Sequence, residues 1–199
     1  MSWATPRRLV VVAIAAALAL TGCSSNDGLA SQYGKGDTKG YISGDSSTFI
    51  SPDSRGKSIS FESTTDEGVA VDSTQYAGKV TVLNFWYGDC APCRTEAPLL
   101  ETISTDYASK NVSFLGVNTR DQAARSQSFA TKYGITYPSV LDADTGNMLL
   151  AFAGSVPANA VPTTLVIDAK GRIAARISGE LDDPTLLTGY LDQVLDESA

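Results

Sequence analysis

The chain has 199 residues and a formal net charge of −7 at pH 7, which is enough length for one domain plus additional segments. It contains no histidine and only three cysteines, so a Cys/His zinc site, a Cys-His hydrolase and a Ser-His-Asp triad each lack a required residue. Because the excess charge is negative, we expect no binding to nucleic acid.

The first 22 residues have the pattern of a bacterial export signal. Arg7 and Arg8 precede the apolar residues 9–20, a run shorter than the roughly 18–20 residues needed to span a bilayer. The following Leu20-Thr21-Gly22-Cys23 resembles the lipobox, in which the chain is cut before the cysteine and that cysteine is lipidated. We therefore expect a signal peptide over 1–22 and a lipid anchor at Cys23, on the extracytoplasmic face of the cell membrane. The alternative is that Cys23 is a spare core thiol.

A polar segment links the expected anchor to the folded part of the chain. Residues 24–45 are largely Gly, Ser, Asp, Lys and Thr, which cannot bury enough apolar surface to fold. This composition predicts a flexible tether over 23–50 and a folded domain over 51–199. Two short apolar segments, 58–61 and 69–71, are separated by polar residues. They predict a β-hairpin added at the N-terminal edge of the sheet.

Two of the three cysteines lie between a predicted strand and a predicted helix. Residues 80–86 are mostly apolar, which is typical of a strand buried on both faces of a parallel sheet. The residues that then recur at helical spacing are Cys93, Ala97, Leu100, Ser104 and Tyr107. At a helix N-terminus the unpaired N–H groups and the helix dipole favour a thiolate. The sequence therefore predicts a reactive Cys90-x-x-Cys93 pair.

The rest of the chain alternates between strand and helix patterns. The predicted elements are strands over 112–117 and 163–167, a helix over 121–133, a hairpin turn at 168–171 and an antiparallel edge strand over 173–177. Pro184 begins the last helix, with Asp182 or Asp183 as its N-cap. This order predicts a central mixed sheet with helices on both faces.

Further motifs accompany the cysteine pair: Phe85-Trp86 before it, Pro98 five residues after Cys93, and Val161-Pro162-Thr163-Thr164 downstream. With them, the order of elements resembles the thioredoxin fold over roughly residues 54–194. More narrowly, it is similar to the membrane-tethered TlpA/ResA-like thiol-disulfide oxidoreductases. The resemblance implies an α/β protein with three α/β/α layers, a redox-active disulfide and no cofactor. We expect it to be a monomer.

Each residue around the pair is expected to have its own role. Cys90, nearest the loop and the positive end of the dipole, should be the exposed attacking thiol, and Cys93 should resolve the mixed disulfide. The alternative is a structural disulfide without a catalytic role. The residues expected to bind substrate are Trp86, Ala91, Pro92, Val161 and Pro162. The resemblance implies that Pro162 is cis and faces the cysteines, which leaves the backbone of Val161 free to pair with a substrate peptide.

Three polar positions near the pair depart from familiar thioredoxin chemistry. Asn84 stands where cytoplasmic thioredoxins carry a buried aspartate, and an amide cannot titrate. The resemblance implies that an acid in the loop after the next strand is used instead, which makes Asp121 the candidate; it could equally cap the following helix. Asp89, directly before Cys90, should oppose thiolate formation, with Arg94 as the residue expected to offset its charge; the alternative is that Asp89 is only a solvated loop residue.

The resemblance implies a reductase that delivers electrons to exported thiol proteins such as apocytochrome c. Its own electrons would come from a membrane thiol reductase of the CcdA/DsbD type. An oxidant in disulfide formation and a non-catalytic lipoprotein binding module remain open as alternatives. A peroxiredoxin is disfavoured because the residues before Cys90 lack the expected Pro-x-x-x-Thr/Ser-x-x-Cys pattern, and a copper carrier of this fold would need a histidine.

Overall fold

The computed structural model describes residues 47–157 and 160–197. The predicted signal peptide, the lipidation site at Cys23 and most of the predicted tether lie outside the described residues. None of the helices within the described ranges has the length and hydropathy needed to cross a bilayer.

The described residues alternate between strands and helices, as the sequence predicts. The strands are β1 (Ser47–Phe49), β2 (Glu62–Thr64), β3 (Ala70–Asp72), β4 (Val80–Trp86), β5 (Val112–Asn118), β6 (Ser139–Leu141), β7 (Thr163–Ile167) and β8 (Ile173–Ser178). The α-helices are α3 (Ala91–Tyr107), α4 (Ala123–Tyr133), α5 (Asn147–Ala151) and α6 (Pro184–Asp196). Short 3-10 turns cover Pro52–Ser54, Ser73–Tyr76 and Ala108–Lys110.

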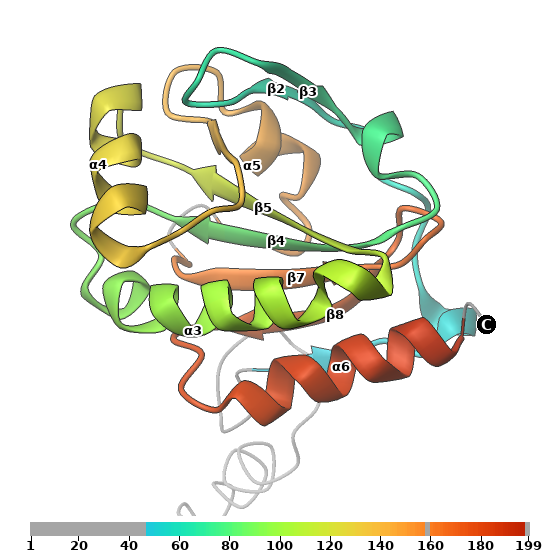
Figure 1. Ribbon diagram of the computed structural model, residues 1–199. Helices are drawn as coiled ribbons and strands as arrows, with labels where there is room; N and C mark the ends of the chain where they lie inside the picture. The colour runs from blue at the N-terminus through green and yellow to red at the C-terminus, as the bar shows by residue number, and fades with distance from the viewer. Residues whose placement is uncertain (1–46, 158–159, 198–199) are drawn as a thin grey trace, which may run out of the picture. The chain divides into compact units, whose positions relative to one another are not determined.

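Six strands form one mixed sheet in the order β1-β8-β7-β4-β5-β6. β4 lies inside this sheet, parallel to β5 and antiparallel to β7, and every residue of β4 is buried, as its apolar pattern predicts. In Figure 1, α3 and α6 cover one face of the sheet, and α5 and the β2–β3 hairpin lie over the other. The predicted three-layer, thioredoxin-like arrangement is therefore confirmed.

The edge of the sheet differs from the prediction. β1 pairs antiparallel with β8, with Phe49 opposite Ala175. The segment 173–177 is therefore an inner strand and was wrongly predicted at the edge. The folded domain also begins before residue 51, inside the segment predicted as tether over 23–50. The strand pattern of β1 is only three residues long, so its pairing depends on the long-range contact with β8 and not on a local signal.

The predicted hairpin is present, but at a different place. β2 and β3 form a separate two-stranded sheet, joined to the main sheet by a bridge between Thr65 and Val140 of β6. The hairpin thus lies beside the edge opposite β1. The hydroxyl of Ser126 in α4 donates to the carboxylate of Asp66 at the hairpin tip, at 2.5 Å. The hairpin covers part of the backbone edge that the short strand β6 leaves open.

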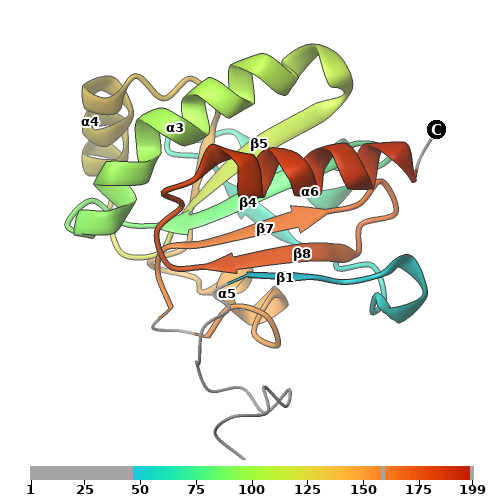
Figure 2. The ribbon, with the colours of Figure 1, turned by 90° about the horizontal axis from the view of Figure 1, so that it is seen from below.

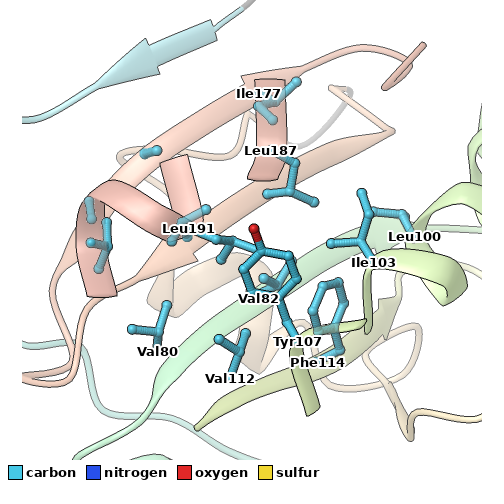
Figure 3. Packing of buried hydrophobic residues seen from close by; sticks show 14 of the residues in the cluster. Val80, Val82, Leu100, Ile103, Tyr107, Val112, Phe114, Ile177, Leu187 and Leu191 are labelled. Carbon is cyan, nitrogen blue, oxygen red and sulfur yellow. The ribbon is translucent and has the colours of Figure 1, made fainter. Parts of the chain in front are cut away.

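A hydrophobic cluster fixes α3 against the sheet. Figure 2 shows α3 and α6 running over the same face, and Figure 3 shows the side chains between them and the sheet. Leu100 and Ile103 of α3 lie close to Leu187 of α6, over Val82 of β4. All four side chains are at most 2% exposed. Because interiors are close-packed, this cluster holds the axis of α3 and hence the position of its first turn, where the cysteines lie.

One of the two residues predicted to cap the last helix is confirmed as its N-cap. Asp183, and not Asp182, is the N-cap of α6, and its carboxylate accepts the N–H of Thr185 at 2.8 Å. Pro184 stands in the first turn, where a missing N–H costs little.

Candidate active site

Cys90 and Cys93 form a disulfide at the first turn of α3, with their Cα atoms 5.2 Å apart. Cys90 is the N-cap residue of the helix, and the N–H of Cys93 points at the Cys90 Sγ at 3.2 Å. Pro92 occupies the first turn. A thiolate on Cys90 would therefore accept a backbone hydrogen bond at the positive end of the helix dipole.

Cys90 is less accessible than the sequence predicts. It is 3% exposed and Cys93 is 2% exposed, because both pack with Trp86 and Phe129 in one apolar cluster. The Trp86 and Phe129 rings lie 4.1 Å apart between centroids. Trp86 is only 5% exposed and packs with the cysteines from β4, so it belongs to the core that supports them, and its role in substrate binding stays a prediction.

Of the other four predicted substrate-binding residues, three are at least partly exposed and the fourth, Pro162, is buried. Ala91 is exposed and Pro92 is half-buried, on the first turn of α3. Val161 is half-buried and packs against the cysteine cluster, and the Val161–Pro162 peptide bond is cis, as the resemblance implies. The carbonyl of Pro162 accepts the N–H of Gly179 at 2.9 Å. Among the described residues, the N–H and C=O of Val161 have no hydrogen-bonding partner.

A buried acid that the sequence analysis missed lies directly behind the pair. Glu96 follows Cys93 by three residues on the same buried face of α3 and is 1% exposed. Its Oε1 accepts the amide N–H of Asn84 at 2.8 Å, and its Oε2 accepts the N–H of Leu181 at 2.8 Å. Asn84 cannot titrate itself, but its amide binds a side chain that can, the carboxyl of Glu96.

Burial gives Glu96 an unusual proton affinity. Desolvation raises the pKa of its carboxyl to about 7, against the smaller opposing effect of the hydrogen bonds from Leu181 and Asn84. Beside it, Asn84 and Cys93 line a cavity of about 10 Å³, which is close to the space of one water molecule. A carboxyl that titrates near neutrality, one helical turn from Cys93, can take up or return the proton of that thiol.

The raised pKa of Glu96 makes the stability of the protein depend on pH. Below about pH 4.5, the ordinary value, the carboxyl is protonated in both the folded and the unfolded chain. As the pH rises from there to about 7, only the unfolded chain releases the proton, so the free energy of unfolding should fall by about 3 kcal/mol. Urea unfolding of the oxidised protein at pH 5 and pH 8 measures this loss.

Two variants test whether Glu96 causes this pH dependence. Glu96→Gln should remove most of the fall in stability between pH 5 and pH 8. Glu101→Gln makes the same change on the same helix, at a side chain that instead accepts the N–H of Thr136 at 2.9 Å, and it should keep the wild-type profile. An equal fall in wild type and Glu96→Gln would contradict the assignment.

Asp121 does not cap α4. The N-cap of that helix is Gln122, so the capping interpretation is wrong. One oxygen of Asp121 accepts the N–H of Gly88 at 2.6 Å and the amide N–H of Asn118 at 3.0 Å. The other pairs with Arg125 Nε at 3.1 Å. Asp121 thus contacts the backbone of the loop before Cys90, while the acid that shares a helix face with Cys93 is Glu96.

The charge of Asp89 is also balanced by a different residue from the one expected. Arg125 of α4 forms an ion pair with Asp89, with the guanidinium against the carboxylate. Arg94 takes part in none of the ion pairs of the described residues, and its backbone N–H donates to the carbonyl of Cys90 at 3.2 Å. The cysteine loop is therefore linked to α4 by charge, and not to its own helix.

A disulfide at the start of a helix, a cis-proline beside it and a buried acid behind it, all on one mixed sheet, define a thiol-disulfide oxidoreductase of the thioredoxin fold. The model of the Redoxin family matches residues 51–191, and the chain belongs to this family. Its site and fold are those of a ResA-like thiol-disulfide oxidoreductase.

Individual relatives agree with this class. The chain is 35% identical over 129 residues to the thiol:disulfide interchange protein HelX of Rhodobacter capsulatus, which covers 65% of this chain and 68% of HelX. It is 33% identical over 108 residues to the thiol-disulfide oxidoreductase ResA of Geobacillus thermodenitrificans, covering 54% of this chain and 59% of ResA. The match thus spans less than two thirds of that ResA protein.

Two solved structures are similar over most of the chain. A DsbF homologue from Corynebacterium diphtheriae is 30% identical with a TM-score of 0.68, covering 79% of this chain and 99% of that one. A secreted thiol-disulfide isomerase from Corynebacterium glutamicum is 28% identical with a TM-score of 0.71, covering 81% and 99%.

Proposed function

We propose that this oxidoreductase is held by a lipid at Cys23 on the extracytoplasmic face of the cell membrane, where it reduces disulfides in exported proteins. The observation that carries the reducing direction is Glu96, a carboxyl buried behind Cys93. A nearby carboxylate disfavours thiolates. A cysteine pair whose reduced, dithiol form is not stabilised has a low reduction potential and donates electrons. Strong oxidants have the opposite property, because their reduced form is stabilised.

In the first step, the Cys90 thiolate attacks one sulfur of the client disulfide. The bond between the two client sulfurs breaks, the Cys90–client bond forms, and the client's other sulfur leaves as a thiolate that takes up a proton. The N–H of Cys93 and the start of α3 stabilise the charge of the attacking sulfur. The backbone N–H and C=O of Val161, which have no partner among the described residues, can hold an extended client segment beside Cys90.

In the second step, Cys93 gives its proton to the carboxylate of Glu96, and its sulfur attacks the Cys90 sulfur. The mixed disulfide breaks, the Cys90–Cys93 disulfide forms, and the second client sulfur leaves. The client gains two electrons and two protons in total, and the enzyme is left oxidised. The structure shows this oxidised product state.

The proposed place and partners of the reaction rest on features of the sequence. The apolar segment 9–20 and the lipobox-like residues before Cys23 support export and lipidation. The resemblance to ResA-like proteins supports apocytochrome c as a client and a CcdA/DsbD-type membrane protein as the electron donor. Cys23→Ala in the full chain should move the protein from the membrane fraction to the soluble extracytoplasmic fraction. Retention of that variant in the membrane would exclude the lipid anchor.

The reduction potential decides between reductase and oxidant. Equilibration of the purified domain with glutathione should give a potential below about −220 mV, on the reducing side of disulfide isomerases at about −180 mV. A value near that of strong oxidants, about −120 mV, would favour a role in disulfide formation instead.

A further inference from the structure

The loop before Cys90 is held at three consecutive residues by the segment that joins β5 to α4 and by the first turn of α4. The Arg120 guanidinium lies 4.1 Å above the ring centroid of Tyr87. The next two contacts are the hydrogen bond from the Gly88 N–H to the Asp121 carboxylate and the ion pair between Asp89 and Arg125. Each contact holds a different residue of the loop, Tyr87, Gly88 or Asp89, so the loop is fixed along its whole length.

The contact at Gly88 is so close that a side chain at this position would displace Arg125. A Cβ at this position would lie 2.9 Å from Arg125 Nε and 3.2 Å from Asp121 Oδ2. The carboxylate and the guanidinium therefore lie directly against the loop backbone. Arg125 contacts both acids, with Nε on Asp121 at 3.1 Å and Nη2 on Asp89, so one side chain joins the two.

The position of Asp89 gives this ion pair a chemical consequence. Its carboxylate belongs to the residue directly before Cys90, and an unpaired anion there would oppose formation of the attacking thiolate. We propose that Arg125 is a positioning residue for disulfide exchange: by pairing with Asp89 and Asp121 it balances the charge beside Cys90 and holds the loop. This inference rests on the proposed function, because it assigns Cys90 as the attacking sulfur.

The ion pair acts among other charges near the cysteine. The elements around Cys90 carry several charged or titratable groups. They are Tyr87 and Asp89 on the loop, Arg94, Glu96, Glu101, Asp106 and Tyr107 on α3, Arg120, Asp121, Arg125, Lys132 and Tyr133 on the β5–α4 segment and α4, and Glu180, Asp182 and Asp183 after β8. Among the ion pairs of the described residues, only that of Arg125 reaches the loop. The side chains of Arg125 and Asp89 are 52% and 71% exposed, so water and salt screen the pair and its effect should be moderate.

The test is the pKa of the Cys90 thiol in the reduced protein, measured from the rate of iodoacetamide alkylation against pH. Arg125→Gln should raise this pKa by about 0.5–1 unit. Arg125→Lys, which keeps the positive charge, should have a Cys90 pKa close to that of the wild type. Asp89→Asn should lower the pKa, and the double variant Arg125→Gln/Asp89→Asn should return it close to wild type. In 1 M salt the effect of Arg125→Gln should shrink, because the screening length falls to about 3 Å.

Lys132→Gln is the matched control: it removes the same charge from α4, at a side chain whose described contact is the ring of Tyr133. It should leave the pKa of Cys90 unchanged. The inference is overturned if Arg125→Gln has no effect, if Lys132→Gln has the same effect, or if Asp89→Asn fails to reverse the shift, which would mean that Arg125 acts only by holding the fold. Alkylation requires no client, so this result is independent of whether exported proteins are the substrates.

Discussion

Glu96→Gln should slow the second step of disulfide exchange, the attack of Cys93 on the mixed disulfide, about 10- to 1,000-fold at pH 7. Two effects of opposite sign combine. Loss of a positioned base costs about 10²–10⁴-fold. Loss of the nearby negative charge lowers the pKa of the Cys93 thiol, and a shift of about one unit restores up to about tenfold of the rate. The loss of the base is the larger effect.

Single-turnover mixing of the reduced protein with a disulfide peptide measures this step. The rate in wild type should rise with pH around an apparent pKa near 7, the value to which burial raises the pKa of Glu96. That rise should be absent in Glu96→Gln. Glu101→Gln, on the same helix but paired with Thr136, should behave as wild type. An unchanged rate and pH profile in Glu96→Gln would show that another group takes the proton.

Cys90→Ser should reduce insulin-disulfide reduction at least about 10³-fold, because a hydroxyl cannot replace the thiolate as the nucleophile. Cys93→Ser is its matched control, since both variants lose the same disulfide, but Cys93→Ser keeps the attacking thiol. Turnover should be lost in both, whereas only Cys93→Ser should still release the first client thiol. Full activity of Cys90→Ser in cells would favour the non-catalytic lipoprotein module.

The sequence predicts the position of the cysteine pair because the signals are local. An apolar strand, a turn and a helical repeat follow one another within 28 residues, from Val80 to Tyr107, and each is set by neighbours in the chain. The cis state of Val161–Pro162 was predictable only through the resemblance, since a cis bond is uncommon at proline in general.

Glu96 could have been found from the sequence. It lies three residues after Cys93 on the helix face that also carries Ala97 and Leu100, where a charged side chain does not belong unless it is held. Its partners come from distant segments, however: Asn84 from β4 and Leu181 from the segment before α6. Neither the pKa near 7 nor the role of Asn84 follows from local patterns.

The contacts of Asp121 and Asp89 were not predictable for the same reason. Asp121 reaches Gly88 across 33 positions of sequence, and Arg125 reaches Asp89 across 36. An aspartate before a helix is often its cap, and an arginine one turn after a cysteine is the nearest cation in sequence. Local reasoning therefore offered capping as an alternative role for Asp121 and named Arg94 as the balancing charge. The packing of the β5–α4 segment and α4 on the cysteine loop instead brings Asp121 to Gly88 and Arg125 to Asp89.

Trapping of the mixed disulfide tests most directly the claim that Cys90 attacks and Cys93 resolves. Reduced Cys93→Ser is mixed with apocytochrome c whose haem-attachment cysteines are joined in a disulfide, and the products are identified by mass spectrometry. We predict one adduct, reversible by dithiothreitol, between Cys90 and a client cysteine, and no adduct with Cys90→Ser. An adduct that forms through Cys93 in Cys90→Ser, with none in Cys93→Ser, would contradict the account.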